Sequence, residues 1–118
     1  MPIEDLIREL KARGLAVEDA PRRIDGIDYV VIAPYTIEMG PYARKAIAIA
    51  FATPPDFPMT PPGGIHVNPH LIPVGTRNTG ASPLGPEWQY WSRPISDWRR
   101  DRSVARLLSQ VNRLMMDA

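Results

Sequence analysis

The nine-residue segment PPDFPMTPP, residues 54–62, limits the folds open to this chain more than any other feature. It holds five prolines, with the aromatic side chain of Phe57 at its centre. Each proline fixes φ, removes a backbone donor and disfavours the helical region for the residue before it. The segment therefore cannot be a helix or a central strand of a sheet. It is either a flexible linker or a stiff bend packed against a folded body, and the flanking sequence decides between the two.

The composition fits one globular domain. The 118 residues are 44% hydrophobic and 23% charged, enough for a single core. The formal net charge of +1 gives no basic footprint for a nucleic acid, and no run of lysine and arginine marks a membrane surface. No apolar run is long enough to span a bilayer and no signal-peptide pattern is present, so we expect a cytoplasmic protein with no nucleic-acid or membrane partner.

Cysteine is absent from the sequence. Disulfides, thiolate metal sites and a cysteine nucleophile are therefore excluded. With only two histidines, a zinc site is not expected either.

Two amphipathic helices are predicted. Residues 3–13 carry an apolar stripe at i, i+3, i+4 and i+7, and Gly14 is placed to end the helix. A longer stripe predicts a second helix over about residues 101–116, with Asp101 or Ser103 as its N-cap. The first stripe consists of Ile3, Leu6, Ile7 and Leu10, and the second of Val104, Leu107, Leu108, Val111, Leu114 and Met115.

Four strands are predicted between the helices. A short extended stretch begins at Val17, and a β-branched strand covers residues 28–32, after a turn signal at Asp25-Gly26. Residues 44–54, RKAIAIAFATP, alternate large apolar side chains with alanine, which is the pattern of a strand with one buried face. After the proline segment, GGIHVNP at residues 63–69 predicts a fourth strand.

Residues 69–97 show no clear period and are expected to form a long loop that is functional or poorly ordered. Strands that follow one another closely favour an antiparallel meander, and the helices must then pack on it. The predicted fold class is α+β.

In this order, Phe57 to Pro62 resembles the aromatic-Pro-x-x-Pro-Pro bend of the ubiquitin-conjugating (E2, UBC-like) fold, which lies between the third and fourth strands of a four-stranded meander. Trp98 and the helix after it are similar to the tryptophan and helix that follow the catalytic loop of E2 proteins. The resemblance covers roughly residues 3–116. It implies one UBC-like domain over residues 1–118, with a stiff bend instead of a linker and the carboxyl-terminal helix packed on the sheet.

The tract EWQYWSRPISDW, residues 87–98, resembles more narrowly the bacterial E2-like proteins with a tryptophan-Ser-Arg signature. That resemblance implies three partners: an E1-like adenylating enzyme, a ubiquitin-like modifier and the amine of a target protein. It implies no cofactor. The pattern departs at Pro94, where the signature continues with histidine. The His-Pro-Asn motif is not intact, because HVNPH at residues 66–70 comes too soon after the proline bend and residues 72–74 read Ile-Pro-Val at its expected place.

An E2 holds the carboxyl terminus of its modifier as an ester, and without cysteine the nucleophile would be a serine. A hydroxyl is a weaker nucleophile than a thiolate and needs activation. Counting forward from the proline bend leads to Ser82, whereas counting back from Trp98 leads to Ser92. Arg93 would stabilise an oxyanion at Ser92, which favours that serine. The aromatic neighbours Trp88, Tyr90 and Trp91 would shield an ester there.

Each serine also has a purely structural interpretation. The WQYW run would pack over the core with Ser92 bonded to a turn, and Ser82 would be a turn serine before Pro83.

Further polar residues are candidates for supporting roles. Asn68 or Asn78 would supply an amide that stabilises the oxyanion, although each also suits a turn. Asp97 would orient the incoming amine or cap a turn. His66 lies in a predicted strand and is expected to be structural, whereas His70 lies in a loop and is a candidate for catalysis.

The resemblance places the E1-binding surface on the amino-terminal helix, whose exposed face carries Glu4, Arg8 and Lys11. Three interpretations stand at this point. The protein is a transferase that uses a serine oxyester, a non-catalytic E2-variant module that binds the modifier or the E1, or a sequence in which a native cysteine was replaced at Ser82 or Ala81.

Overall fold

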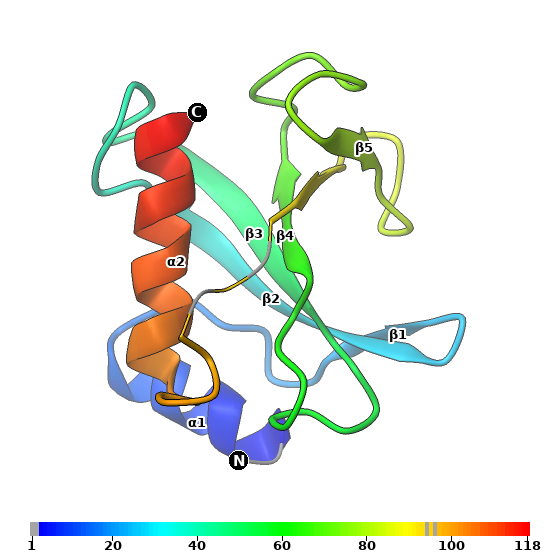
Figure 1. Ribbon diagram of the computed structural model, residues 1–118, viewed down its shortest axis with the longest axis vertical. Helices are drawn as coiled ribbons and strands as arrows, with labels where there is room; N and C mark the ends of the chain where they lie inside the picture. The colour runs from blue at the N-terminus through cyan, green and yellow to red at the C-terminus, as the bar shows by residue number, and fades with distance from the viewer. Residues whose placement is uncertain (1–2, 94, 96) are drawn as a thin grey trace.

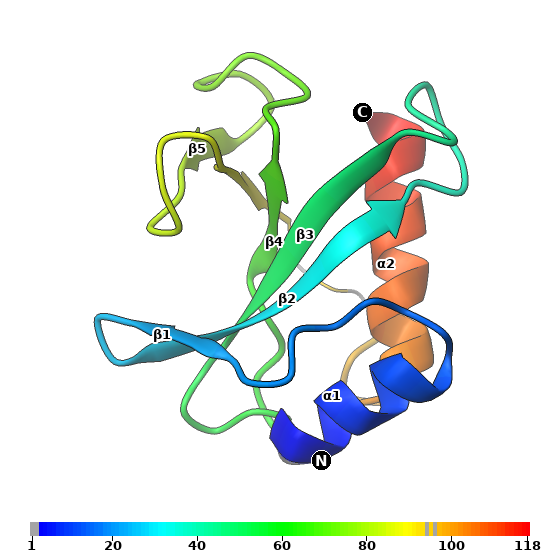
Figure 2. The same cartoon turned by 180° about the vertical axis from the view of Figure 1, so that it is seen from behind.

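A computed structural model describes residues 3–93, 95 and 97–118. One helix crosses a face of an antiparallel sheet and the other lies at the end of that sheet, beside the start of the first (Figure 1). Seen from behind, the sheet lies in front of the longer helix (Figure 2). The elements in chain order are α1 (Ile3–Ala12), β1 (Arg22–Ile24), β2 (Ile27–Thr36), β3 (Ala46–Thr53), β4 (Gly64–Asn68), β5 (Thr79–Ala81), β6 (Gln89–Ser92) and α2 (Val104–Asp117).

Both predicted helices are confirmed. Three residues of the α1 stripe, Leu6, Ile7 and Leu10, are buried, and Ile3 is half-buried. Gly14 ends the helix at φ 83°, with its N–H bonded to the Lys11 carbonyl at 2.9 Å. In α2 the cap is Ser103, whose Oγ accepts a hydrogen bond from the Arg106 amide at 3.2 Å. In the described part of the chain, neither helix has the length and apolar character that crossing a membrane requires.

The sheet has six strands in the order β1-β2-β3-β4-β6-β5, all paired antiparallel, so the expected count of four is wrong. At the start, Val17 makes only an isolated bridge to Ile32, and the first strand forms later through a turn at Asp25 and Gly26, both at positive φ. At the end, β5 and β6 lie within the stretch expected to be a loop. These strands have three and four residues, too short to show a period in sequence.

The two faces of the sheet bury different side chains. The face under α2 carries the main hydrophobic core, which includes Ile32, Phe51 and Trp91. Because side chains alternate along a strand, the outer face carries the intervening residues. A smaller cluster lies there, formed by Val31, Ala50 and Trp88.

The proline segment is a stiff bend packed on the body of the protein. The Trp98 indole N–H donates to the Pro58 carbonyl at 2.6 Å, and the rings of Phe57 and Trp98 lie 6.1 Å apart. Phe57 is half-buried and packs against the main hydrophobic core. The bend lies near the amino-terminal end of α1 in both views (Figures 1 and 2). Because Trp98 lies shortly before α2, its contacts with Pro58 and Phe57 tie the bend between β3 and β4 to the segment that leads into α2.

The indole hydrogen bond gives a test of this connection. Trp98→Phe keeps an aromatic ring but leaves the Pro58 carbonyl without its donor. A lost hydrogen bond of this kind costs roughly 1–2 kcal/mol. Trp88→Phe is the matched control, because Trp88 is equally buried and its indole N–H has no partner among the described residues. We expect Trp98→Phe to lower the free energy of unfolding in urea more than the control, and equal losses would contradict the role of the bond.

Candidate functional site

A groove of about 610 Å³ lies on the outer face of the sheet. Three strands contribute ring side chains to it, namely Tyr29 from β2, His66 from β4 and Tyr90 from β6. Prolines from both ends of the proline bend form another part of its wall. Among the described residues, none that lines the groove carries a formal charge. The groove is therefore suited to an uncharged, partly apolar ligand.

Small residues keep the groove open. Ala52 lines it from β3, the strand whose outer positions are alanines. Gly64 is required where it stands, because a Cβ there would lie 1.9 Å from the Trp91 carbonyl oxygen on β6. A larger residue at position 64 would push β6 away from β4 and disturb the wall that Tyr90 forms.

Ser82, one of the two candidate nucleophiles, is hydrogen-bonded to a histidine at the groove. Its Oγ lies 2.7 Å from Nδ1 of His66, and it accepts a second bond from the Leu84 amide at 3.2 Å. Ser82 follows β5 and stands between Ala81 and Pro83, which both line the groove. The bond from the Leu84 amide is the one that a turn serine makes, so the turn interpretation of Ser82 is compatible with the structure. The bond to His66 is additional, because a turn serine does not need it.

The environment of His66 keeps its ring neutral. The side chain is 4% exposed and stacks on Tyr90 at a centroid distance of 4.7 Å, with Tyr29 edge-on at 5.3 Å. Burial lowers the pKa of His66 from its ordinary 6.5 to about 4. At neutral pH the imidazole is therefore uncharged, and one ring nitrogen is available to accept a proton.

Ser92, the other candidate nucleophile, lies at the end of β6 with an exposed side chain. Its amide donates to the Asn78 carbonyl at 3.0 Å, and the structure shows no partner for its Oγ among the described residues. Trp88 and Trp91 are buried, as the core-packing interpretation of the WQYW run expects. No histidine is bonded to this serine within the described chain.

The residues proposed to assist Ser92 bond mainly to backbone. Arg93 reaches the carbonyls of Ser92 and Asn78 with Nη1, at 3.0 and 3.4 Å. Asn78 adopts a positive φ of 56° before β5, and Asp97 one of 58°, with its carbonyl accepting bonds from two amides of the following turn. Both residues serve turns, and both side chains are exposed.

Two candidate residues remain, His70 and Asn68, and each has a structural role. Nε2 of His70 lies 3.0 Å from the carbonyl oxygens of Pro86 and Trp88, so this nitrogen must be the donor. The interaction ties the loop before β6 to the segment after β4. Asn68 ends β4 opposite Ala48 and is half-buried. Among the hydrogen bonds of the described residues, none joins His70 or Asn68 to Ser82 or Ser92.

Gln89 is a positioning residue that was missed in the sequence. Its side chain is fully buried, and Oε1 accepts from the Leu71 amide and the Trp91 indole, each at 2.9 Å, while Nε2 donates to the Ile72 carbonyl at 2.8 Å. These bonds hold the segment after β4 against β6. The only sign of this role in the sequence is that Gln89 is the one amide side chain in the aromatic run WQYW.

The alternation of side chains along β4 could have shown from the sequence that His66 lies on the outer face of the sheet. Gly64, His66 and Asn68 alternate with the core residues Ile65 and Val67.

Metal ligands are not clustered in this structure. Within residues 3–93, 95 and 97–118, no three histidine, aspartate or glutamate side chains gather where they could hold a metal ion.

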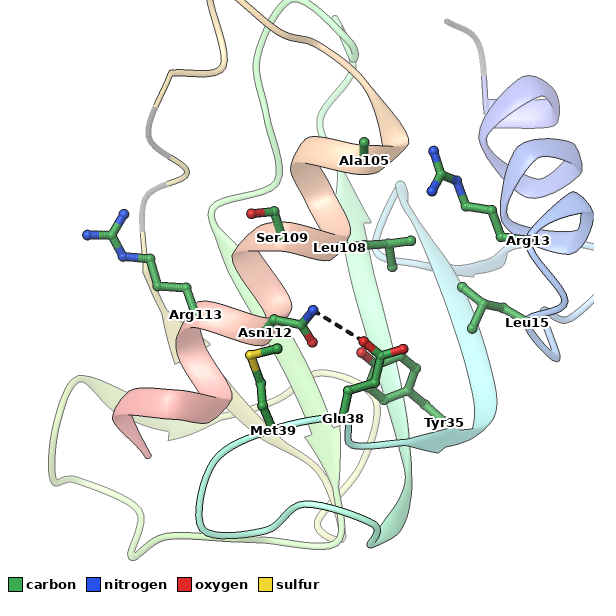
Figure 3. Close-up of a pocket in the computed structure, with 10 residues that line it drawn as sticks. All are labelled: Arg13, Leu15, Tyr35, Glu38, Met39, Ala105, Leu108, Ser109, Asn112 and Arg113. Carbon is green, nitrogen blue, oxygen red and sulfur yellow. Dashed lines mark hydrogen bonds between the residues drawn. The ribbon is translucent and has the colours of Figure 1, made fainter.

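A second cavity, of about 650 Å³, lies on the other side of the molecule, between α2, the end of α1 and the β2–β3 connection (Figure 3). Asn112 bonds to Glu38 across it at 3.4 Å, and Arg13 and Arg113 flank it. Ser109 lines this cavity, but no histidine does among the described residues. None of the predicted site residues lies there, and a serine without a neighbouring base is a poor nucleophile.

The predicted E1-binding residues form an exposed face of α1. Glu4, Arg8 and Lys11 are all exposed. Arg8 forms an ion pair with Asp5, and Lys11 forms one with Asp19, which lies beyond the helix. The cations of this face are thus partly neutralised, and their net field is weaker than the sequence alone suggests.

The neutral, buried ring of His66 makes stability depend on pH. The unfolded chain takes up a proton near pH 6.5, whereas folded His66 does so only near 4. The stabilising contribution is therefore complete above about pH 6.5 and is lost as the pH falls towards 4, by roughly 3 kcal/mol in all. His66→Phe removes the titrating group. Between pH 7 and 4 we expect the wild type to lose roughly 3 kcal/mol of unfolding free energy relative to His66→Phe. A difference between the two proteins that stays constant with pH would contradict the burial of a neutral ring.

Comparison with known proteins identifies the family of this chain. The family model described as prokaryotic E2 family E matches residues 2–118. No curated protein and no solved structure matches the chain. Two terminal helices around an antiparallel sheet, with the proline bend between β3 and β4, are consistent with the UBC-like fold. The chain belongs to prokaryotic E2 family E, and it does so without a cysteine.

Proposed function

We propose that this protein accepts the carboxyl terminus of a ubiquitin-like modifier from an E1 partner as a serine oxyester and passes it to the amine of a target protein. Family membership supports the E2-like role, and the lack of cysteine requires another nucleophile. The observation that carries the proposal is the 2.7 Å bond between Ser82 and the neutral His66 at an open groove.

The chemistry follows from this pair. As the Ser82 hydroxyl attacks the activated carbonyl, its proton moves to His66, and the E1-derived leaving group takes that proton as it departs. An amine of the target then attacks the oxyester and gives a proton to His66. His66 returns this proton to the Ser82 oxygen as the ester bond breaks and the modifier passes to the target. An oxyester is less reactive toward amines than a thioester, so transfer is expected to be slower than in an enzyme that uses cysteine. Ser92 with Arg93 is the competing nucleophile, and the experiment below includes it.

The second candidate function is a non-catalytic module that binds the modifier or the E1. It is favoured by the Leu84 amide, which donates to Ser82 Oγ as in an ordinary serine turn. A protein of this kind would use the groove for binding alone and would form no covalent adduct.

The covalent step can be observed with E1, ATP and the cognate modifier. We expect an adduct that resists thiol reductants and is cleaved by hydroxylamine, as an oxyester is. Ser82→Ala should abolish it, and Ser82→Cys should give a reductant-sensitive thioester in its place, because sulfur is the better nucleophile. Gel shifts and intact mass would detect both adducts. Ser109→Ala, an exposed serine of α2, serves as the matched control and should react like the wild type.

Other outcomes distinguish the alternatives. Loss of the adduct in Ser92→Ala but not in Ser82→Ala would assign the nucleophile to Ser92, and Arg93→Ala should then slow the reaction about ten- to a thousandfold. Modifier binding without any adduct would sink the catalytic proposal and support the binding module.

The E1-binding surface is tested by charge reversal on α1. The double variant Arg8→Glu/Lys11→Glu should bind the E1 about five- to thirtyfold more weakly, since exposed charges of this kind contribute roughly 0.5–1 kcal/mol each. Titration of labelled protein at 0.1 and 0.5 M salt would measure the loss, which should shrink at high salt.

Arg23→Glu is the control for this experiment. Arg23 is exposed and paired with Asp28, as Arg8 is with Asp5, but it lies on β1, far from α1 (Figures 1 and 2). An equal loss of affinity in the control would place the E1 elsewhere or indicate a nonspecific charge effect.

A further inference from the structure

We infer that Ser82 and His66 form a nucleophile–base pair that reacts on its own with small, uncharged acyl esters in the outer-face groove. The inference uses the serine of the proposed function, but the activity needs neither an E1 nor a modifier. It assigns to His66, which was expected to be structural, direct contact with the reacting hydroxyl.

The hydrogen-bond pattern sets the direction of the proton. The Oγ of Ser82 already accepts from the Leu84 amide, so its own hydrogen is free to point at Nδ1 of His66. We assign to His66 the tautomer with its proton on Nε2, because Nδ1 then accepts. This is the protonation state in which imidazole acts as a general base towards a serine.

The base is held in place by its surroundings. His66 sits in β4 between Ala50 of β3 and Tyr90 of β6, and its ring contacts Tyr90 and Tyr29. Ser82 completes the polar contacts of the ring within the described chain. No charged side chain contributes to the lowered pKa of His66, whose cause is burial. In the described part of the chain no carboxylate is bonded to His66 to stabilise the imidazolium, and we expect a slow, dyad-like reaction.

The groove determines which acyl groups fit. Its volume of about 610 Å³ is within the range of small-molecule sites, and its described lining is uncharged. Tyrosine rings and proline side chains offer apolar contact to an acyl chain. An anionic substrate would lose its hydration there without gaining a cationic partner, so neutral esters are favoured.

The reaction balances without a cofactor. Ser82 Oγ forms a bond to the ester carbonyl carbon, and His66 takes the hydroxyl proton. As the tetrahedral intermediate collapses, the bond to the alcohol oxygen breaks and His66 returns the proton to the alcohol. Water then repeats the sequence on the acyl-serine, releasing the carboxylic acid and restoring the hydroxyl.

A neutral alkyl fluorophosphonate tests the pair, because it phosphonylates an activated serine and releases fluoride. With the full chain alone, we expect labelling at Ser82, located by peptide mass spectrometry, and slow hydrolysis of p-nitrophenyl butyrate. Ser82→Ala should abolish both. His66→Gln, which keeps a polar side chain but no base, should slow labelling about a hundredfold, at the low end for general-base catalysis. Ser109→Ala is the control and should match the wild type.

The pH profile separates a base from a structural histidine. Because the pKa of His66 lies near 4, the labelling rate should be constant between pH 5.5 and 8, provided that thermal unfolding shows each variant folded there. A rate that halves near pH 6.5, labelling equal in wild type and folded His66→Gln, or no labelling of Ser82 would overturn the inference.

The two proposals can fail separately. Labelling of Ser82 without an E1-dependent adduct would leave the nucleophile–base pair standing and remove the transferase. An E1-dependent adduct on Ser82 that is insensitive to His66→Gln would support the transferase and overturn the nucleophile–base pair.

Discussion

The pairing of β6 with β4 is the constraint on which the rest of the outer face depends. Its register sets His66 opposite Tyr90 and Gly64 opposite Ser92, so residues 24 to 28 positions apart in the chain become neighbours. β5 then adds to the free edge of β6 and brings Ser82 to His66. Gly64 permits this arrangement, since any side chain there would collide with the β6 backbone. Without this register the groove would lose the wall that Tyr90 forms, and Ser82 would not meet His66.

Side-chain hydrogen bonds hold the added strands, together with the burial of Trp91 in the main core. β5 and β6 are short, and short strands have little area to bury. Gln89 compensates by bonding the segment after β4 and the Trp91 indole at once, and His70 ties the same segment to the chain before β6. A satisfied buried network specifies one geometry, because each bond left unmade costs a desolvated polar group.

The loss of a thiol changes what the site must supply. A cysteine is partly ionised near neutral pH and needs little help, whereas a serine hydroxyl needs a base at hydrogen-bond distance. His66 meets the distance, but its burial opposes the imidazolium that forms when it takes the proton. The site thus favours a reaction with an activated acyl donor over one with an unactivated ester or amide.

The sequence by itself determined the two helices, the proline bend and strands β2, β3 and β4, because these features follow local rules of spacing, capping and backbone restriction. It also excluded thiol chemistry and named both serines. Only the tertiary structure showed β5 and β6 and the partnership of His66 with Ser82. These strands have three and four residues, too few for an alternating pattern to be recognised, and the two side chains meet only through long-range strand pairing. The two counts along the chain led to one serine each, and Arg93 with its aromatic neighbours favoured Ser92. The base that lies beside Ser82 in space could not be seen in the sequence.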